Sequence, residues 1–479
     1  MAAPAVDACG DGDRVNTVAR PFPAHAAPYG SPRAPSRGVF PWVPAFIVFQ
    51  LLCQLALITG DIGWARMLVR MAAFGASLAL IIVLRGRGSP HPAAGPAVLA
   101  LGVLAICVFH PETRSLVGGL AQVGLYAAVL GPLFWVPRLT SIDLRMLRRA
   151  LLILWGFHAL SATLGVLQVY RPGTFQPPVS AVVESKGKGY IESLKITTAT
   201  GQRVFRPMGL TDVPGGAAIS GLYAVLLGVG FFLTRRTLPV MAMSLASVGL
   251  GVAVLYLSQI RALVVMTGIS LVAVACILLW RKDVRRLTTL VVGMGVVVLV
   301  GYYAARNMAG ADVTNRMATL VRARPGQVYY ENRGRFLEDA LFKTLPRAPF
   351  GEGLGHWGMT ATYFGGDAPA KNVWVEIMWA GWIVDGGAPL LVTYLLVIAV
   401  ALLAGWRIAR APPPSPAAHD LPFWGAIVLA YSVGATALTF SYPIFLSQSG
   451  MEFWLLNATL FAAARNARQA ALADGLAAR

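Results

Sequence analysis

Long apolar runs recur along this chain, and they constrain its fold more than any other feature. The run at residues 255–280, LYLSQIRALVVMTGISLVAVACILLW, contains a single charged residue, Arg261. A helix of about 20 apolar residues is needed to cross the hydrocarbon core of a bilayer. Only 13% of the residues are charged, against about a quarter in soluble domains. The sequence therefore predicts an all-α, polytopic integral membrane protein.

The apolar runs predict about 12 transmembrane helices. Their approximate bounds are 40–60, 67–84, 92–110, 115–136, 148–170, 212–233, 238–257, 259–280, 287–304, 374–404, 421–440 and 449–464. Residues 1–38 are rich in Ala, Pro, Gly and Arg and have no apolar core, so we expect a disordered cytoplasmic tail and no cleavable signal peptide. The membrane domain is expected over residues 39–470, with a second cytoplasmic tail at 471–479.

The net charge of +19 is concentrated in short turns between the apolar runs. Basic residues gather in the turns on one side of the predicted bundle, which is typical of the cytoplasmic side of a membrane. Both termini are therefore expected in the cytoplasm, and no nucleic-acid partner is indicated. The four cysteines form no CxxC pair, and three lie in apolar runs. We expect neither a disulfide framework nor a metal site, and no cofactor.

Two connections are long, residues 171–211 and 305–373, and both fall on the outer side of this topology. In the second, the segment 331–346 (ENRGRFLEDALFKTLP) has leucines at i, i+4 and i+8, which predicts an amphipathic helix lying at the membrane interface. The sequence GEGLG at 351–355 follows it. Its glycines indicate a flexible turn that lets the backbone approach a ligand or a helix closely.

Basic residues also gather at the outer membrane boundary, against the general bias. They are Arg206, Arg261, Arg335 and Lys371. Each is compatible with an interfacial anchor whose charged end reaches phospholipid headgroups. Guanidinium groups also match phosphate oxygens, and several together would neutralise a diphosphate.

Acidic and histidine side chains near the same boundary are candidates for proton transfer. Asp212 and Glu352 are candidate general bases, and His356 is the only histidine in either long connection. A structural role is also open for each of these side chains. Asp212 would then pair with Arg206, and His356 would be an ordinary surface residue.

Four motifs, taken in order, resemble the O-antigen polymerase and O-antigen ligase superfamily of bacterial envelope glycosyltransferases. They are an Arg-x-x-Gly segment before a span (RPMGLTDVPGG), a Ser-x-Arg-like element opening a span (SQIRA, one residue looser than usual), an Arg-led helix followed by Pro and a Gly-x-Gly turn (RGRFLEDALFKTLPRAPFGEGLG), and a polar-Asn pair opening a span (KNVWVEIMWAGWIVDGG). The resemblance covers approximately residues 200–400.

The resemblance implies a GT-C-type glycosyltransferase architecture in the bacterial inner membrane, with two long periplasmic loops and a site facing the periplasm. It implies that undecaprenyl-diphosphate-linked oligosaccharides serve as donor and acceptor, that membrane lipid is a partner, and that a chain-length regulator is a possible further one. The expected reaction transfers a growing glycan to a sugar hydroxyl of another lipid-linked repeat, with inversion and without a metal. The basic residues Arg206, Arg261, Arg335 and Lys371 would bind the diphosphate, and the proton-transfer candidates would be Asp212, Glu352 and His356.

One departure from the family distinguishes between its branches. The ligase branch has His-Asn in the fourth motif, where this chain has Lys371 and Asn372. A charged lysine is a poor base but a good phosphate partner, which favours an O-antigen or exopolysaccharide polymerase. Within the family, the competing hypothesis is an O-antigen ligase that acts on lipid A core. Outside the family, a transporter or flippase for lipid-linked sugars and a structural scaffold also stay open.

Overall fold

The computed structural model describes residues 40–58, 65–86, 88–179, 183, 187–234, 237–322, 325–364, 373 and 375–477. The predicted cytoplasmic tail at 1–38 lies outside these residues, and so do Lys371 and Asn372. Over the described ranges the fold is helical, apart from one short antiparallel hairpin. The sequence-based prediction of a helical fold is confirmed.

Eight helical segments in the described part of the chain are long and apolar enough to cross a membrane. They are α2 (Ala65–Val83), α6 (Leu144–Tyr170), α10 (Ala217–Thr234), α11 (Leu238–Ser258), α12 (Arg261–Trp280), α13 to α14 (Val284–Met308), α20 (Met378–Arg410), and α21 (Leu421–Leu438) with the preceding turn η5 (Pro416–Ala418). The pair formed by α4 (Leu116–Leu130) and Pro132–Arg138, bent by 47°, raises the number to nine if it is one span. The protein is therefore a multi-pass membrane protein by helix length and hydropathy.

Three further helices occupy the remaining predicted spans. Helix α1 (Trp42–Ala56) has 15 residues and α3 (Ala94–Cys107) has 14, which is short for a membrane crossing. Helix α22 (Gln448–Ala477) has 30 residues and extends well beyond the predicted span at 449–464, into the predicted tail. Each predicted span thus contains a helix, but twelve membrane crossings remain a prediction.

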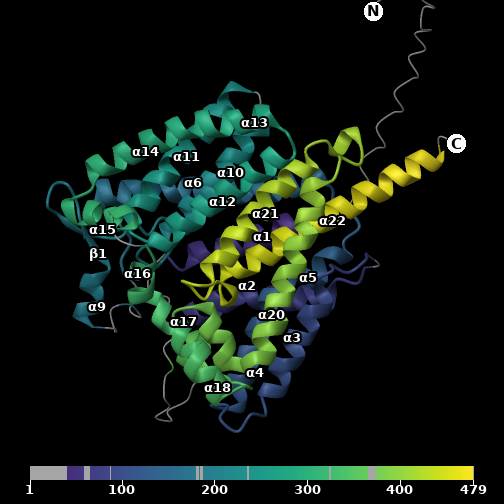
Figure 1. Ribbon diagram of the computed structural model, residues 1–479, viewed down its shortest axis with the longest axis horizontal. Coiled ribbons are helices and arrows are strands. Elements are labelled where there is room, and N and C mark those ends of the chain that lie inside the picture. Colours follow the sequence, from purple (N-terminus) through teal and green to yellow (C-terminus); the bar gives the residue numbers. More distant parts are fainter. Residues whose placement is uncertain are drawn as a thin grey trace, which may run out of the picture. The chain divides into compact units, whose positions relative to one another are not determined.

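The long connections carry the shorter elements (Figure 1). The first contains α7 (Pro172–Phe175), α9 (Lys188–Ser193), β1 (Lys195–Thr197) and β2 (Arg203–Phe205). The second contains α15 (Ala311–Arg322), α16 (Pro325–Tyr329), η3 (Tyr330–Gly334), α17 (Arg335–Asp339), η4 (Ala340–Thr344), α18 (Leu345–Arg347) and α19 (Gly358–Phe364). The remaining elements are α5 (Pro132–Trp135), η1 (Val136–Arg138), α13 (Val284–Thr288), η2 (Thr289–Gly293), α14 (Met294–Met308) and η6 (Ile444–Leu446).

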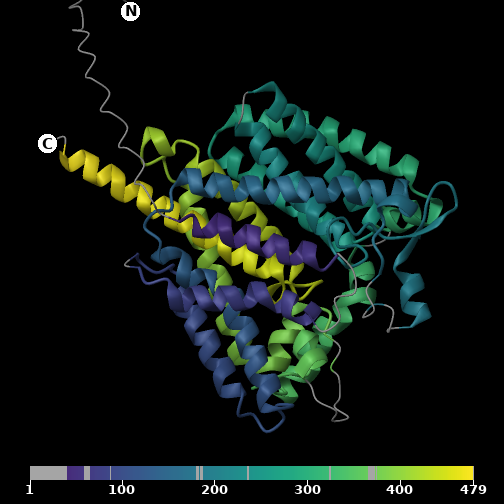
Figure 2. The same ribbon diagram turned by 180° about the vertical axis from the view of Figure 1, so that it is seen from behind.

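The two long connections pack against each other through the hairpin. Strand β1 pairs with β2, and Thr198, just after β1, forms a β-bridge with Ala309 at the end of α14. Ile196 and Val204 then share a buried cluster with Val313 from α15. Figure 1 shows β1 beside α15, and Figure 2 shows the same molecule from behind. The hairpin therefore fixes α15 close to the start of α10 and α12.

The predicted amphipathic helix at 331–346 is helical, but it is not a regular α-helix. The segments η3 and η4 are π-helical, with five residues each, and they flank α17. Leu341 and Leu345 pack against the main hydrophobic core, whereas Phe342 is 75% exposed. Because a π-helical turn holds more residues than an α-helical one, residues four apart do not lie directly above one another, and the three leucines do not form a regular stripe.

Residues 351–355, called the glycine loop below, pack against neighbouring backbone. Gly351, Gly353 and Gly355 have φ of 96°, 89° and 82°, a region in which glycine avoids the strain of other residues. A Cβ on Gly353 would lie 2.6 Å from the backbone nitrogen of Thr113. The loop also pairs with the kink of α20, where Glu352 N–H donates to the carbonyl of Val384 at 2.7 Å. The loop therefore approaches helices closely, which was one of the two predicted uses.

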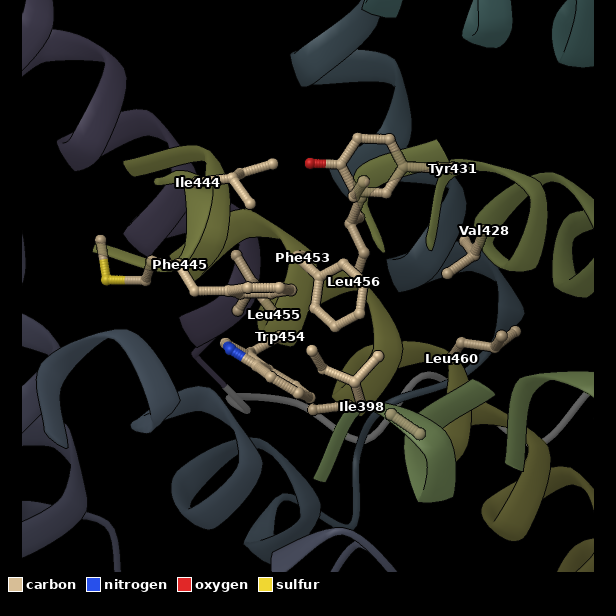
Figure 3. Close-up of a cluster of buried hydrophobic side chains, with 14 of the residues drawn as sticks. Ile398, Val428, Tyr431, Ile444, Phe445, Phe453, Trp454, Leu455, Leu456 and Leu460 are labelled. Atoms are coloured by element: carbon tan, nitrogen blue, oxygen red, sulfur yellow. The ribbon is translucent and has the colours of Figure 1, made fainter. Parts of the chain in front are cut away.

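The main core contains a cluster of aromatic side chains at the start of α22 (Figure 3). The rings of Phe445 and Phe453 have centroids 5.0 Å apart, and those of Phe453 and Trp454 are 4.6 Å apart. Tyr431 lies at the edge of this cluster with its hydroxyl directed away from Val428 (Figure 3). Packed rings of this size contribute both apolar burial and edge-to-face contacts, so the start of α22 is held firmly among its neighbours.

Candidate functional site

A cavity of about 1110 Å³ opens among the helix ends and the two long connections, and we call it the arginine cavity. It is bounded by the ends of α1, α11 and α21 and by the starts of α2, α10, α12 and α22, together with α15, α16 and η3. The sequence-based topology places all seven of these helix ends on one side of the membrane. Their meeting at one cavity agrees with that relative sidedness, while the orientation in the membrane stays a prediction.

The loop that carries Arg206 is fixed by polar side chains of α6. The backbone N–H groups of Met208 and Gly209 both donate to Gln168 Oε1 at 2.8 Å, and Gln168 Nε2 donates to the carbonyl of Gly209 at 3.0 Å. Gly209 has φ of 61°, and a Cβ there would lie 2.4 Å from Ser161 Oγ. The glycine of the Arg-x-x-Gly motif thus allows the loop to lie directly on α6.

Arg206 itself is placed by the hairpin. Its backbone N–H donates to the carbonyl of Leu194 at 2.9 Å, and its Nη2 donates to the carbonyl of Ser193 at 2.8 Å. A Cβ on Gly215, which has φ of 88°, would lie 3.0 Å from Ile260 and 3.9 Å from Cδ of Arg206, so the chain passes close to both side chains. These contacts direct the guanidinium into the arginine cavity, which Arg206 lines.

Arg261 is the first residue of α12, as the sequence predicts. The preceding Gln259 adopts a left-handed conformation with φ of 57°, which breaks the chain sharply between α11 and α12. The side chain of Arg261 donates from Nη1 to Thr319 Oγ1 of α15 at 2.9 Å. Arg261 therefore lines the cavity at a helix N-terminus, where the helix dipole also favours an anion.

A third arginine, Arg316 of α15, lies with these two in the cavity wall. Burial, together with the charge of Arg316, lowers the pKa of Arg206 to about 10. Partial burial of its guanidinium likewise lowers the pKa of Arg316, and the charge of Arg261 acts in the same direction. We call Arg206, Arg261 and Arg316 the arginine triad. Within the triad, the charge of Arg316 acts on Arg206 and the charge of Arg261 acts on Arg316.

The arginine triad has no carboxylate within ion-pair distance in the described ranges of the chain. A guanidinium carries five N–H donors, and the side-chain bonds of Arg206 and Arg261 described above use only one each. Like charges brought together without a counter-charge destabilise the fold. The triad is therefore suited to an anion with several oxygen atoms.

Asp212 also lines the cavity, but it is held in an ion-pair cluster. Its carboxylate pairs with Arg66 and Arg70, both from α2. The structural role predicted for Asp212 was a pair with Arg206, and that pairing is not formed. Arg70 lines the cavity as well, so Asp212 fixes a fourth guanidinium at the cavity wall.

The segment before α17 supplies one more basic side chain, Arg333. It forms an ion pair with Glu376, near the start of α20. Tyr329 beside it donates from its hydroxyl to the carbonyl of Phe440 at 3.1 Å. These contacts tie the second long connection to the ends of α20 and α21, and they close one side of the cavity.

The rest of the wall has two characters. Apolar side chains from α2 and α12 line one part, namely Val69, Phe74, Leu263, Val265, Met266 and Ile269. Polar side chains from α1, α6, α10 and α22 line another, namely Gln54, His158, Ser220, Gln448 and Glu452. A cavity with this lining is suited to a ligand that combines an anionic group with hydrocarbon and hydroxyl groups.

Three predicted site residues are not among the residues that line the cavity. Arg335 is exposed on α17. Glu352 pairs with Arg347, and His356 Nε2 donates to the carbonyl of Glu112 at 2.6 Å. Lys371, the fourth predicted phosphate ligand, lies outside the described residues.

Sequence reasoning missed Arg70, Arg316, Arg333 and Glu452. Glu452 carried a usable signal, because an acidic residue inside an apolar run is costly in a membrane and is usually functional. Nothing in the sequence marks Arg316 as a site residue, since charged residues are common in a long polar connection. Only the hairpin contact, which joins the two connections, places it beside Arg206 and Arg261.

Within the described part of the chain, no group of three or more His, Cys, Asp or Glu side chains could hold a metal ion. Comparison with models of known protein families finds none that matches, and comparison with curated proteins finds no match.

Proposed function

We propose that this protein is a polysaccharide polymerase that acts on lipid-linked glycans at the outer face of the bacterial inner membrane. The donor would be a growing glycan on a polyprenyl diphosphate, and the acceptor a sugar hydroxyl of another lipid-linked repeat. The observation that carries the proposal is the arginine triad, whose three guanidinium groups meet without a carboxylate at the wall of a large cavity among membrane helices.

The triad supports this reaction because the leaving group is a diphosphate. As the bond between the anomeric carbon and the diphosphate oxygen breaks, negative charge grows on that oxygen. Preorganised positive side chains stabilise such charge more strongly in a partly dehydrated site than in water. Their mutual repulsion is relieved when the anion binds, so binding offsets part of the strain in the empty protein.

The apolar part of the wall supports a lipid-linked substrate over a soluble sugar nucleotide. Leu263, Val265 and Met266 of α12 continue from Arg261 along the cavity. A polyprenyl chain would lie along these side chains while its diphosphate meets the triad. Helix α12 would thus contact both the diphosphate, through Arg261, and the polyprenyl chain.

The roles of the other predicted residues are adjusted to this geometry. Asp212, paired with Arg66 and Arg70, would hold guanidinium groups in place and not act as a base. Arg335, which is exposed and does not line the cavity, would contribute little to diphosphate binding. Lys371 keeps its proposed role as a phosphate ligand on the strength of the sequence motif alone.

The test is incubation of the purified protein in lipid nanodiscs with a defined lipid-linked repeat, followed by gel or mass analysis. A polymerase lengthens this substrate without another acceptor, whereas a ligase requires lipid A core. Arg261→Ala should remove polymer formation while the protein still inserts. Arg149→Ala is the matched control, since Arg149 is exposed in the cytoplasmic half predicted for α6. No lengthening by the wild-type protein would refute the proposal.

A further inference from the structure

Glu452 is a buried carboxylate in the first turns of α22, only 3% exposed, and it lines the arginine cavity. Its neighbours in the wall, His158 and Ser220, are 3% and 1% exposed. Arg206 and Arg261 in the same cavity are only partly buried, and Arg316 is more exposed than either. The polar part of the cavity that contains Glu452 is therefore the deeper part, and the arginine triad lies nearer to solvent.

The hydrogen bonds of Glu452 leave part of its accepting capacity unused. Tyr223 Oη donates to Oε2 at 2.6 Å, Gln50 Nε2 donates to Oε1 at 3.1 Å, and Gln448 Nε2 lies 3.4 Å from Oε1. A carboxylate offers about four lone-pair sites. Three are directed at these donors, and one remains for a hydroxyl in the cavity.

No Lys, Arg or His in the described ranges forms an ion pair with Glu452. The contrast with Asp212, held by Arg66 and Arg70 in the same cavity, is direct. A buried carboxylate without a cation costs folding free energy. Glu452 is buried despite this cost, lines a cavity and has a free lone pair. Its carboxylate is therefore placed to accept a proton.

His158 gives an independent indication that a polar ligand enters here. Its ring stacks on Tyr223, with centroids 4.3 Å apart and planes 5° apart, and its Nδ1 lies 3.1 Å from Ser220 Oγ. Its Nε2 is buried and has no hydrogen-bond partner among the described residues. Buried polar atoms are nearly always paired, so this nitrogen lacks a partner that a hydroxyl-rich ligand would supply.

We propose that Glu452 is the catalytic base and that the polar wall around it binds the acceptor sugar. This inference rests on the proposed function. The acceptor hydroxyl would give its proton to the Glu452 carboxylate while its oxygen forms a bond to the anomeric carbon of the donor glycan. The bond from that carbon to the diphosphate oxygen breaks, and its electron pair stays with the lipid diphosphate at the arginine triad. The proton then leaves Glu452 to water.

Tyr223 would act as a positioning residue. Its hydroxyl lies 2.6 Å from Glu452 Oε2 and 2.8 Å from Tyr431 Oη. Tyr431 lies at the edge of the aromatic cluster at the start of α22 (Figure 3). The pair of tyrosines thus fixes the carboxylate against the best-packed part of the helix bundle.

The experiment compares Glu452→Gln, Glu452→Asp and Tyr223→Phe with the wild-type protein in nanodiscs. Turnover of a lipid-linked repeat and binding of the lipid diphosphate are measured separately. Loss of a general base lowers rates by about 10²–10⁴-fold. We expect Glu452→Gln to lose turnover in that range with binding of the lipid diphosphate changed less than about 3-fold. Glu452→Asp should retain part of the activity.

The pH dependence separates a base from a structural role. Wild-type turnover should rise with pH through the ionisation of the base, Glu452→Gln should lose that rise, and Tyr223→Phe should displace it. If Glu452→Gln turns over as fast as the wild-type protein, the inference is overturned and the proposed function stays intact. If Glu452→Gln does not fold, an unchanged pH profile in both Glu452→Asp and Tyr223→Phe would overturn it. A wild-type protein that forms no polymer would overturn both proposals.

Discussion

The arginine cavity and the region around the glycine loop each contain a buried carboxylate, Glu452 and Asp385, and the two carboxylates have different surroundings. Asp385 of α20 is fully buried and accepts hydrogen bonds from Gln122 Nε2 at 3.0 Å, Tyr126 Oη at 2.8 Å and Trp357 Nε1 at 2.9 Å. Every donor comes from the protein, and Asp385 does not line the arginine cavity. Glu452 is equally buried but lines that cavity.

Burial of a carboxylate therefore does not by itself indicate a catalytic role. Around the glycine loop, the predicted catalytic residues Glu352 and His356 make contacts within the protein, to Arg347 and to the backbone of Glu112. The His356 contact attaches the second long connection to the turn between α3 and α4. In the cavity, the arginine triad and Glu452 keep donors and acceptors for a ligand. The first region supports the fold, and the second is the proposed site.

The largest expected effect is on stability, at Asp385. Asp385→Ala would leave three buried donors without an acceptor, and each such group costs about 1–3 kcal/mol. We expect the free energy of unfolding to fall by about 4 kcal/mol, measured by thermal or denaturant unfolding in detergent. Activity per folded molecule should be kept. The exposed Asp474→Ala is the control, and equal stability of the two variants would contradict the structural role.

The next effect is on activity, at Arg316. Arg316→Ala removes the arginine that acts electrostatically with Arg206 and with Arg261. We expect polymer formation to fall about 100-fold, or about 2.7 kcal/mol of transition-state stabilisation. The unfolding temperature should not fall, because the variant removes repulsion from the triad. Turnover of a lipid-linked repeat provides the measurement. Activity within about 3-fold of the wild type would remove Arg316 from the site.

A smaller effect on stability is expected in the glycine loop. Gly353 has φ of 89° and lies against the backbone of Glu112 and Thr113, so Gly353→Ala is strained both by its conformation and by contact. We expect a loss of about 2 kcal/mol in unfolding free energy. Gly102→Ala, in α3 with no atom within 4 Å of its Cβ position, should be neutral or stabilising. A similar response from both variants would contradict the close packing of the loop.

The smallest effect is expected at Arg335. Because its side chain is exposed and does not line the cavity, Arg335→Ala should change turnover by less than about 3-fold. The measurement is the same polymer assay, run beside Arg261→Ala. A loss as large as that of Arg261→Ala would mean that α17 moves to the cavity when substrate binds.

The sequence was informative about features that depend on a single helix, namely where it lies in the chain and which residues stand at its end. Apolar run lengths follow from the thickness of a bilayer, and they place a helix in each predicted span. Of the four basic residues expected together, Arg206 and Arg261 line one cavity, since both lie near the starts of helices. The sequence was less informative about helix length, as α1 and α3 show with 15 and 14 residues.

Contacts between distant segments could not be predicted in this way. Nothing in the local pattern of Arg316 shows that the hairpin at β1 and β2 brings α15 to Arg206. The pairing of Asp212 with α2 depends on how two helices are placed relative to each other, which spacing along the chain does not encode. Glycines predict a tight turn at 351–355, but the partner of that turn is known only from the fold.

The most direct measurement of the central claim is the binding of undecaprenyl diphosphate to the protein in nanodiscs, by native mass spectrometry. The wild-type protein is compared with a variant in which Arg206, Arg261 and Arg316 are all replaced by Ala, and with Arg149→Ala. We predict binding at least about 100-fold weaker in the triple variant and unchanged binding in Arg149→Ala. Equal binding of the lipid diphosphate by the wild type and the triple variant would contradict this claim.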